Sequence, residues 1–202
     1  MDSELLIIFT KNPVLGQVKT RLAQTIGHPK ALAVFRNLLA QAAKAVKGWG
    51  GDVWVFYSDY LPENDLWSDI ATKSFLQEGD DLGKRMAQAF RLGLQDYQQV
   101  VLVGTDIPGI SAKVVNDAFD ALKQTDWVLG PTFDGGYYLV GMNRFMSSIF
   151  EDMVWSTSEV LAQTLERIKS HDQSFSLVQQ LVDVDDEDDL KRFPWLMNSR
   201  AR

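Results

Sequence analysis

The strongest constraint on the fold is a pair of short, uninterrupted apolar runs at residues 5–9 and 100–103. Runs of this kind are typical of strands covered on both faces, as in a parallel sheet with helices on either side. Further strand-like runs follow, and much of the chain between them has apolar residues at helical spacing. This alternation predicts an α/β sandwich with a mainly parallel sheet.

The expected elements follow from these patterns and from the turn residues that flank them. Strands are expected at residues 5–9, 53–57, 74–77, 100–103, 127–129 and 137–140. Residues 175–178 and 181–184 are short and apolar. Helices are expected at residues 29–46, 82–94, 111–122, 156–169 and 186–193. Ser111 is placed to cap the third helix, and Ser156 with Glu159 would form a capping box for the fourth. The length of 202 residues fits one domain over residues 1–202.

Composition narrows the function classes. The absence of cysteine excludes disulfides, thiol catalysis and cysteine-based zinc sites, and it is compatible with the cytoplasm, where we expect the protein. Neither a signal peptide nor a spanning helix is expected at the N-terminus. The net charge of −7 argues against a nucleic-acid partner, because phosphate binding needs a basic face. Six acids between residues 183 and 189 account for nearly all of that charge.

The loop at residues 11–21 runs from the first strand into a helix and carries three cations, Lys11, Lys19 and Arg21. Backbone N–H groups at a loop-to-helix junction attract anions, and lysine and arginine add full positive charge. One interpretation is a phosphate-binding loop, and the other is an exposed turn with ordinary surface cations. The loop matches neither the Walker A pattern nor the Gly-x-Gly-x-x-Gly dinucleotide fingerprint.

Carboxylates follow two of the expected strands. Asp106, just beyond residues 100–103, could hold a Mg²⁺ ion, which takes one or two carboxylates, or could simply close a turn. Asp183 and Asp185 are two residues apart, so on an extended segment they would point to one face. We expect Asp185 to be the second metal ligand, with Asp183 as its neighbour. The acids at residues 186–189 are expected at a helix N-terminus, where negative charge is favourable.

Two further segments each allow two interpretations. The Asp-Gly-Gly-Tyr sequence at residues 134–137 permits close approach of a ligand, but it is also a plain hairpin signal. In the segment 77–86, Gln77 and the backbone near Gly83 could read a base edge, and Arg85 could reach a phosphate. The alternative for that segment is a helix N-terminus with acids in its first turn.

Six segments, in order along the chain, resemble the motifs of a known family. They lie at residues 9–22, 77–86, 104–109, 130–139, 155–157 and 183–190. The family comprises small bacterial GT-A-fold transferases, labelled glycosyltransferase-like or radical-SAM/selenodomain-associated transferases. It is similar to 2-phospho-L-lactate guanylyltransferase and to the molybdenum-cofactor guanylyltransferases. The resemblance implies the nucleotide-diphospho-sugar transferase (GT-A) fold, a Rossmann-like three-layer sandwich.

The resemblance also implies roles by position. The nucleotide would contact Lys11, Gly16, Lys19, Arg21, Gln77, Gly83 and Arg85. Mg²⁺, or Mn²⁺, would be held by Asp106 and Asp185. The acceptor pocket would be formed by Gly135, Gly136, Tyr137, Trp155 and Thr157. The first loop departs from the Gly-x-Gly-Thr-Arg-Met type of the best-known sugar nucleotidyltransferases. The resemblance therefore predicts neither the identity of the base nor the orientation of the phosphates.

Three functions are compatible with these residues. In a Mg²⁺-dependent nucleotidyltransferase, an acceptor phosphate or carboxylate would attack the α-phosphate of an NTP, and Lys11, Lys19 and Arg21 would stabilise the leaving pyrophosphate. The cationic loop favours this function, since a triphosphate carries more charge than a nucleotide sugar. A metal-dependent glycosyltransferase would use Asp134 as the base on an acceptor hydroxyl. The third is a non-catalytic nucleotide-binding protein. Each takes small molecules, with neither nucleic acid nor a membrane as partner.

Overall fold

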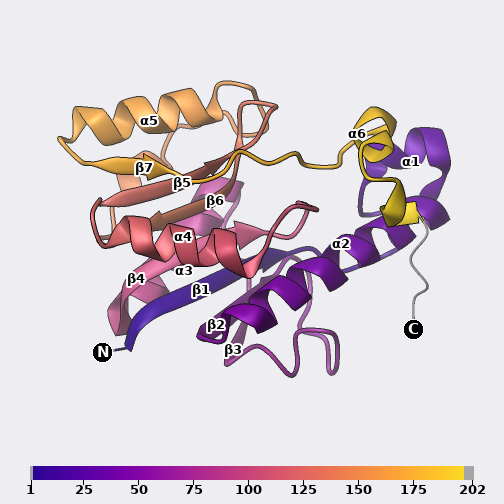
Figure 1. The fold of residues 1–202 in the computed structure, drawn as a ribbon, viewed down its shortest axis with the longest axis horizontal. Helices are drawn as coiled ribbons and strands as arrows, with labels where there is room; N and C mark the ends of the chain where they lie inside the picture. Colours follow the sequence, from indigo (N-terminus) through magenta and orange to yellow (C-terminus); the bar gives the residue numbers. More distant parts are fainter. Residues whose placement is uncertain (1, 198–202) are drawn as a thin grey trace.

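The computed structural model describes residues 2–197 and builds them around one seven-stranded sheet (Figure 1). The strand order is β3-β2-β1-β4-β6-β5-β7. The strands are β1 (Asp2–Thr10), β2 (Asp52–Tyr57), β3 (Lys73–Leu76), β4 (Tyr97–Gly104), β5 (Trp127–Pro131), β6 (Tyr137–Met142) and β7 (Phe175–Leu177). β6 runs antiparallel to both of its neighbours, β4 and β5, and the other pairings are parallel. The prediction of a mainly parallel sheet is confirmed.

Helices cover both faces of the sheet and make the fold a three-layer sandwich. They are α1 (Thr20–Ile26), α2 (His28–Trp49), α3 (Leu82–Asp96), α4 (Ala112–Leu122), α5 (Val160–Ser170) and α6 (Glu187–Lys191), with 3-10 turns η1 (Ser147–Ile149) and η2 (Pro194–Met197). On one face α2 and α4 bury Phe35 and Phe119. On the other face α3 and α5 bury Phe90 and Ile168. A smaller apolar cluster joins α1, α2 and α6.

Local sequence explains where several helices begin. The Ser111 hydroxyl accepts a hydrogen bond from the N–H of Val114 at 3.3 Å, which confirms the predicted cap of α4. The Asp81 carboxylate caps α3 in the same way, accepting from the N–H of Lys84 at 2.8 Å. Such caps satisfy N–H groups that have no partner inside the helix.

One short apolar run lies outside the sheet, and one expected helix cap is wrong. Residues 181–184 form no strand, because Leu181 makes a single bridge to Thr132 and the chain then leaves the sheet. Val184 is instead buried in the cluster between α1, α2 and α6, which draws the chain away from β7 (Figure 1). The capping box at Ser156 is also absent: α5 begins at Val160 without a side-chain cap, and Ser156 has a φ of 63°.

The loops that carry the candidate residues emerge together at one edge of the sheet. Phe9 pairs with both Phe56 and Gly104, so β1, β2 and β4 end at a common level. Because β6 runs antiparallel, it begins at this same edge. Both α1 and α6 lie beyond that edge (Figure 1). Within residues 2–197, no helix combines the length and apolar character needed to cross a membrane.

Candidate functional site

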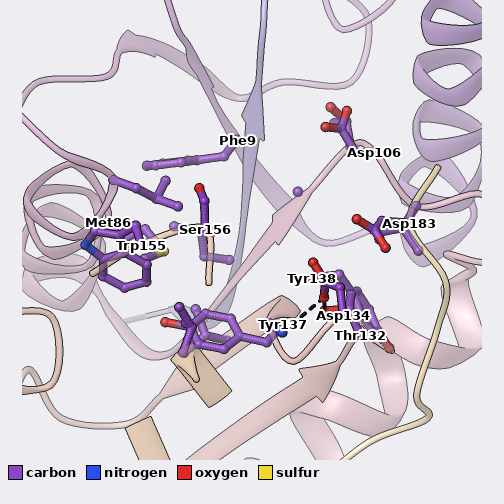
Figure 2. Close-up of a pocket in the computed structure, with 18 of the residues that line it drawn as sticks. Phe9, Met86, Asp106, Thr132, Asp134, Tyr137, Tyr138, Trp155, Ser156 and Asp183 are labelled. Carbon is purple, nitrogen blue, oxygen red and sulfur yellow. Dashed lines mark hydrogen bonds between the residues drawn. The ribbon is translucent and has the colours of Figure 1, made fainter. Parts of the chain in front are cut away.

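A cavity of about 310 Å³ lies at the edge where β1 and β4 end. Figure 2 shows that its walls have two different characters. The apolar side presents Phe9, Met86, Tyr137 and Trp155, and the acidic side presents Asp106, Asp134 and Asp183. Ligand sites in open α/β sheets lie beyond the carboxyl ends of the strands, and this cavity is in that position.

Aromatic packing shapes the apolar side. The rings of Tyr137 and Trp155 meet edge to face, with centroids 6.5 Å apart and an interplanar angle of 87°. Gly83 makes room for Trp155, because a Cβ there would lie 2.7 Å from an indole carbon and 2.6 Å from the Phe150 carbonyl oxygen. The absence of a side chain at Gly83 therefore allows Trp155 to pack closely and form part of the cavity wall.

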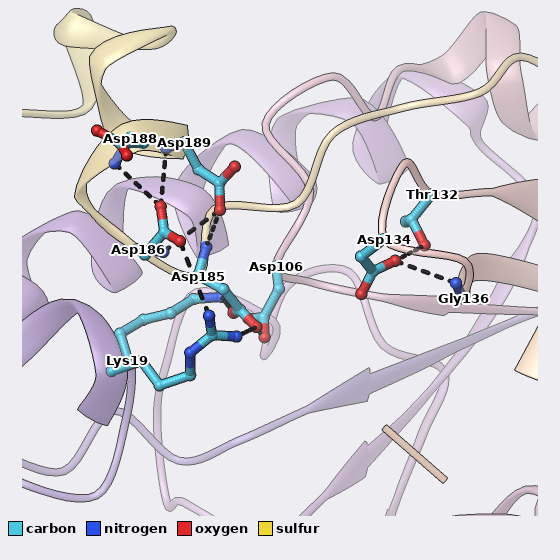
Figure 3. Close-up of polar contacts among 10 residues, drawn as sticks. Lys19, Asp106, Thr132, Asp134, Gly136, Asp185, Asp186, Asp188 and Asp189 are labelled. Atoms are coloured by element: carbon cyan, nitrogen blue, oxygen red, sulfur yellow. Dashed lines mark hydrogen bonds and ion pairs between the residues drawn. The ribbon is translucent and has the colours of Figure 1, made fainter. Parts of the chain in front are cut away.

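Asp134 is held by the hairpin that joins β5 to β6. Its Oδ1 accepts hydrogen bonds from the Thr132 hydroxyl at 2.5 Å and from the N–H of Gly136 at 3.0 Å (Figure 3). Gly135 has a φ of 90°, and a Cβ there would lie 2.1 Å from the carbonyl oxygen of Ser158. The segment is thus a tight hairpin turn, and it also presents a carboxylate to the cavity.

Asp183 lies half-buried where the chain crosses from the sheet to α6. Burial raises the pKa of its carboxyl to about 6. The negative charges of Asp134 and Asp185 contribute to this rise after burial, while the positive charge of Lys19 acts in the opposite direction. The negative charges of Asp134, Asp183 and Asp185 therefore repel one another.

Lys19 connects the first loop to two of the predicted site carboxylates. Its Nζ lies 3.0 Å from Asp106 Oδ2 and 3.1 Å from Asp185 Oδ1 (Figure 3), and its side chain is only 3% exposed. Burial alone would lower the pKa of Lys19, but the charges and hydrogen bonds of Asp106 and Asp185 outweigh burial and raise it. Lys19 is therefore a buried, charged ammonium, held with a left-handed backbone at a φ of 47°.

Arg21 and the remaining acids of the C-terminal run form an outer layer. The exposed guanidinium of Arg21 lies 3.7 Å from Asp185 Oδ2 and 3.7 Å from Asp186 Oδ2. Asp186 accepts hydrogen bonds from the N–H groups of Asp188 and Asp189 and, with Asp189, forms a capping box for α6 (Figure 3). This confirms the prediction that residues 186–189 begin a helix.

The predicted metal ligands Asp106 and Asp185 do come together. Their oxygens have the chemistry that Mg²⁺ or Mn²⁺ prefers, and each side chain is 42% exposed. The position between them, however, is filled by the ammonium of Lys19. Within residues 2–197, no group of three or more acidic or histidine side chains is arranged to hold a metal ion. The carboxylates thus fit a divalent cation by chemical type, and the ammonium of Lys19 lies between them.

Other predicted residues divide between the cavity and its surroundings. Lys11, Gln77, Gly136, Tyr137, Trp155 and Thr157 line the cavity. The described lining does not include Gly16, Lys19, Arg21, Gly83, Arg85, Gly135 or Asp185. The Arg85 side chain is turned back, because its Nε donates to the Gly79 carbonyl oxygen at 3.0 Å.

Sequence reasoning assigned no role to several residues of the apolar wall. Phe9, Leu82, Met86 and Leu102 all line the cavity. They are apolar residues in or beside strands and helices, and such positions ordinarily indicate the core. Phe9, Leu82 and Met86 lie inside the motif segments at residues 9–22 and 77–86, and this was the one signal available.

A family model described as "Uncharacterized protein conserved in bacteria (DUF2064)" matches residues 38–157. A comparison with curated proteins found no match. Among solved structures, a provisionally named nucleotide-diphospho-sugar transferase from Desulfovibrio desulfuricans G20 is 26% identical. It superposes with a TM-score of 0.85 over 98% of each chain.

More distant structures share the fold alone. CMP:2-keto-3-deoxy-manno-octonic acid synthetase complexed with CTP is 14% identical, with a TM-score of 0.56 over 98% of this chain and 99% of that one. Rv0371c from Mycobacterium tuberculosis H37Rv, solved as a complex with manganese, is 13% identical, with a TM-score of 0.53 over 98% and 100%. The fold is therefore that of the nucleotide-diphospho-sugar transferases.

Proposed function

The chain belongs to the DUF2064 family, and we propose that it is a nucleotidyltransferase dependent on Mg²⁺ or Mn²⁺. It would transfer a nucleoside monophosphate from an NTP to a small acceptor that bears a phosphate or carboxylate. The observation that carries this proposal is the two-sided cavity, which combines an apolar wall with three carboxylates. A nucleotide matches both sides, because its base is flat and its phosphates bind together with a divalent cation.

The charge of the cavity supports a requirement for a cation. Asp106, Asp134 and Asp183 face it, and among its described lining residues Lys11 is the one cation. The phosphates of an NTP would add to the repulsion that already raises the pKa of Asp183. Asp106 and Asp185 would hold the metal ion, which when bound offsets charge on the reacting phosphates.

The apolar wall suits the base, and Gln77 would help to select it. The Gln77 Nε2 donates to the carbonyl oxygens of Thr10 at 3.3 Å and Phe56 at 3.0 Å. With both amide hydrogens used, the carbonyl oxygen of Gln77 is the group left to meet a ligand. It would accept a hydrogen bond from the amino group of guanine, cytosine or adenine.

The reaction needs positioning more than proton transfer. An acceptor oxygen would form a bond to the α-phosphorus, and the bond to the α,β-bridging oxygen would break, with its electron pair leaving on pyrophosphate. A phosphate or carboxylate acceptor is already ionised at neutral pH, so no general base is required. Lys11 and Arg21 would stabilise the leaving pyrophosphate, and Gly136, Tyr137 and Thr157 would contact the acceptor.

A second candidate is a metal-dependent glycosyltransferase. The similarity to the provisionally named nucleotide-diphospho-sugar transferase favours it. Asp134, fixed by Thr132 and Gly136, would then accept the proton of an acceptor hydroxyl. Label transferred only from an NDP-sugar would support this candidate, whereas label from an α-labelled NTP would support nucleotidyl transfer.

A thermal-shift screen tests the proposal without knowledge of the acceptor. We expect an NTP with an amino-bearing base to raise the melting temperature in the presence of Mg²⁺ or Mn²⁺, and less so with a chelator. Asp106→Asn should remove the metal-dependent part of the shift. Asp120→Asn is the matched control, because Asp120 lies on exposed α4 surface and pairs with Lys123. No stabilisation by any NTP would refute the proposal.

A further inference from the structure

We propose that Lys19 is an internal counter-ion for Asp106 and Asp185, and that its ammonium leaves this pair when a divalent cation binds there. The inference rests on the proposed function, because it concerns how the same site accepts a metal ion. It assigns Lys19 two positions, one in the metal-free protein and one in the loaded protein. In the first position the ammonium lies between the two carboxylates, as in Figure 3.

The ammonium of Lys19 has the contacts expected of a cation that takes the place of a metal ion. Its ammonium is shared between carboxylates from two distant segments, at 3.0 Å from Asp106 and 3.1 Å from Asp185. A divalent ion bound by both carboxylates would need this same shared space. The two cations therefore compete, and their simultaneous occupation of the space is excluded by volume and by charge.

The accessibility of the three side chains indicates how exchange can occur. The Lys19 side chain is 3% exposed, but the carboxylates of Asp106 and Asp185 are each 42% exposed. A metal ion can therefore approach the outer oxygen of Asp106 from solvent before the ammonium leaves, whereas the outer oxygen of Asp185 lies 3.7 Å from the exposed guanidinium of Arg21. Once it is bound, its charge keeps the two carboxylates together, and Lys19 is no longer needed for that purpose.

The position of Asp106 gives the released ammonium a function. Asp106 lines the cavity, so an ammonium that leaves Asp106 is next to the place where phosphates would bind. The backbone of Lys19 is left-handed, with a φ of 47°, a conformation that is unfavourable for a residue with a side chain. The ion pairs hold Lys19 in this conformation in the metal-free state. Lys19 would thus reach phosphate only when the metal is present.

Replacement of Lys19 separates metal affinity from nucleotide affinity. Lys19→Met keeps an unbranched side chain of similar length but removes the charge. We expect calorimetry with Mn²⁺ alone to show a dissociation constant about tenfold lower than that of the wild type. In saturating Mn²⁺, the same variant should bind the NTP more weakly. Lys123→Met is the matched control, because Lys123 also pairs with acids but is exposed on the surface.

Unchanged or weakened Mn²⁺ binding by a folded Lys19→Met protein would overturn the proposal. If that variant does not fold, amine acylation of the wild type read by mass spectrometry replaces it. Added Mn²⁺ should then make Lys19 more reactive and leave Lys123 unchanged, and equal reactivity of Lys19 with and without Mn²⁺ would refute exchange. A failed nucleotide screen together with a positive Mn²⁺ result would reject the proposed function alone.

Discussion

The replacement Asp183→Asn should stabilise the metal-free protein at neutral pH but not at acidic pH. The carboxyl of Asp183 has a pKa of about 6, against an ordinary value of 3.8, mainly because of burial and then because of Asp134 and Asp185. A shift of that size corresponds to at most about 3 kcal/mol, at about 1.4 kcal/mol per pKa unit. Asp183 is only half-buried, so solvent screening reduces the expected effect to about 1 kcal/mol.

The direction of the pH dependence follows from proton binding. Because its pKa is higher in the folded state, Asp183 holds a proton more tightly there than in the unfolded chain. The folded protein loses stability as pH rises from about 4 to about 6, where the unfolded carboxyl is ionised and the folded one still is not. Above about pH 6 the full penalty is present. Asparagine stays neutral, so its advantage appears over this same interval.

Urea unfolding in a chelating buffer measures this difference. The free energies of unfolding of wild type and Asp183→Asn should nearly coincide at about pH 4 and differ by about 1 kcal/mol at about pH 7.5. Asp188→Asn is the control from the same acidic run, because Asp188 is exposed and pairs with Lys191. A variant that is less stable at neutral pH, or a difference that does not change with pH, would refute the reasoning.

Three other changes test how the walls of the cavity and its helices are held. Gly135→Ala would place a Cβ against the Ser158 carbonyl oxygen at a φ of 90°, so thermal unfolding should show a loss of about 3 kcal/mol, and a neutral result would contradict the geometry. Ser111→Ala removes a helix cap and should cost about 1 kcal/mol in urea unfolding, with no change in ligand binding. Arg167→Met removes hydrogen bonds to carbonyl oxygens in the segment 148–152, so amide hydrogen exchange should quicken there while the sheet stays protected.

The layers of the fold could be predicted because they depend on local patterns. The apolar runs at residues 5–9 and 100–103 became the two central strands β1 and β4, and Ser111 capped the predicted helix. The run at residues 181–184 is apolar for a different reason. Its last residue, Val184, packs between helices rather than in the sheet. Sequence patterns report burial, but they do not report which neighbours provide it.

The loops of the site could be predicted from strand ends, but the contacts within them could not. Lys19 follows a strand and precedes a helix, which is the pattern of a phosphate-binding cation. Its burial depends on Asp185, which lies 166 residues further along the chain. Similarly, Gln77 matched a base-reading position, yet its amide hydrogens are bonded to backbone carbonyls. Only the tertiary structure determines which polar groups remain free for a ligand.

The acidic run at residues 183–189 shows how local and distant interactions combine in this site. Asp186 and Asp189 act locally, as a capping box whose partners lie within a few residues. The Asp189 carboxylate also accepts hydrogen bonds from the N–H of Asp185 at 3.1 Å and of Asp186 at 3.3 Å. The cap therefore fixes the backbone of Asp185, and with it the carboxylate that meets Lys19. The acids at the start of α6 thus orient Asp185 without lying in the candidate site themselves. A change in the helix cap should therefore also displace Asp185.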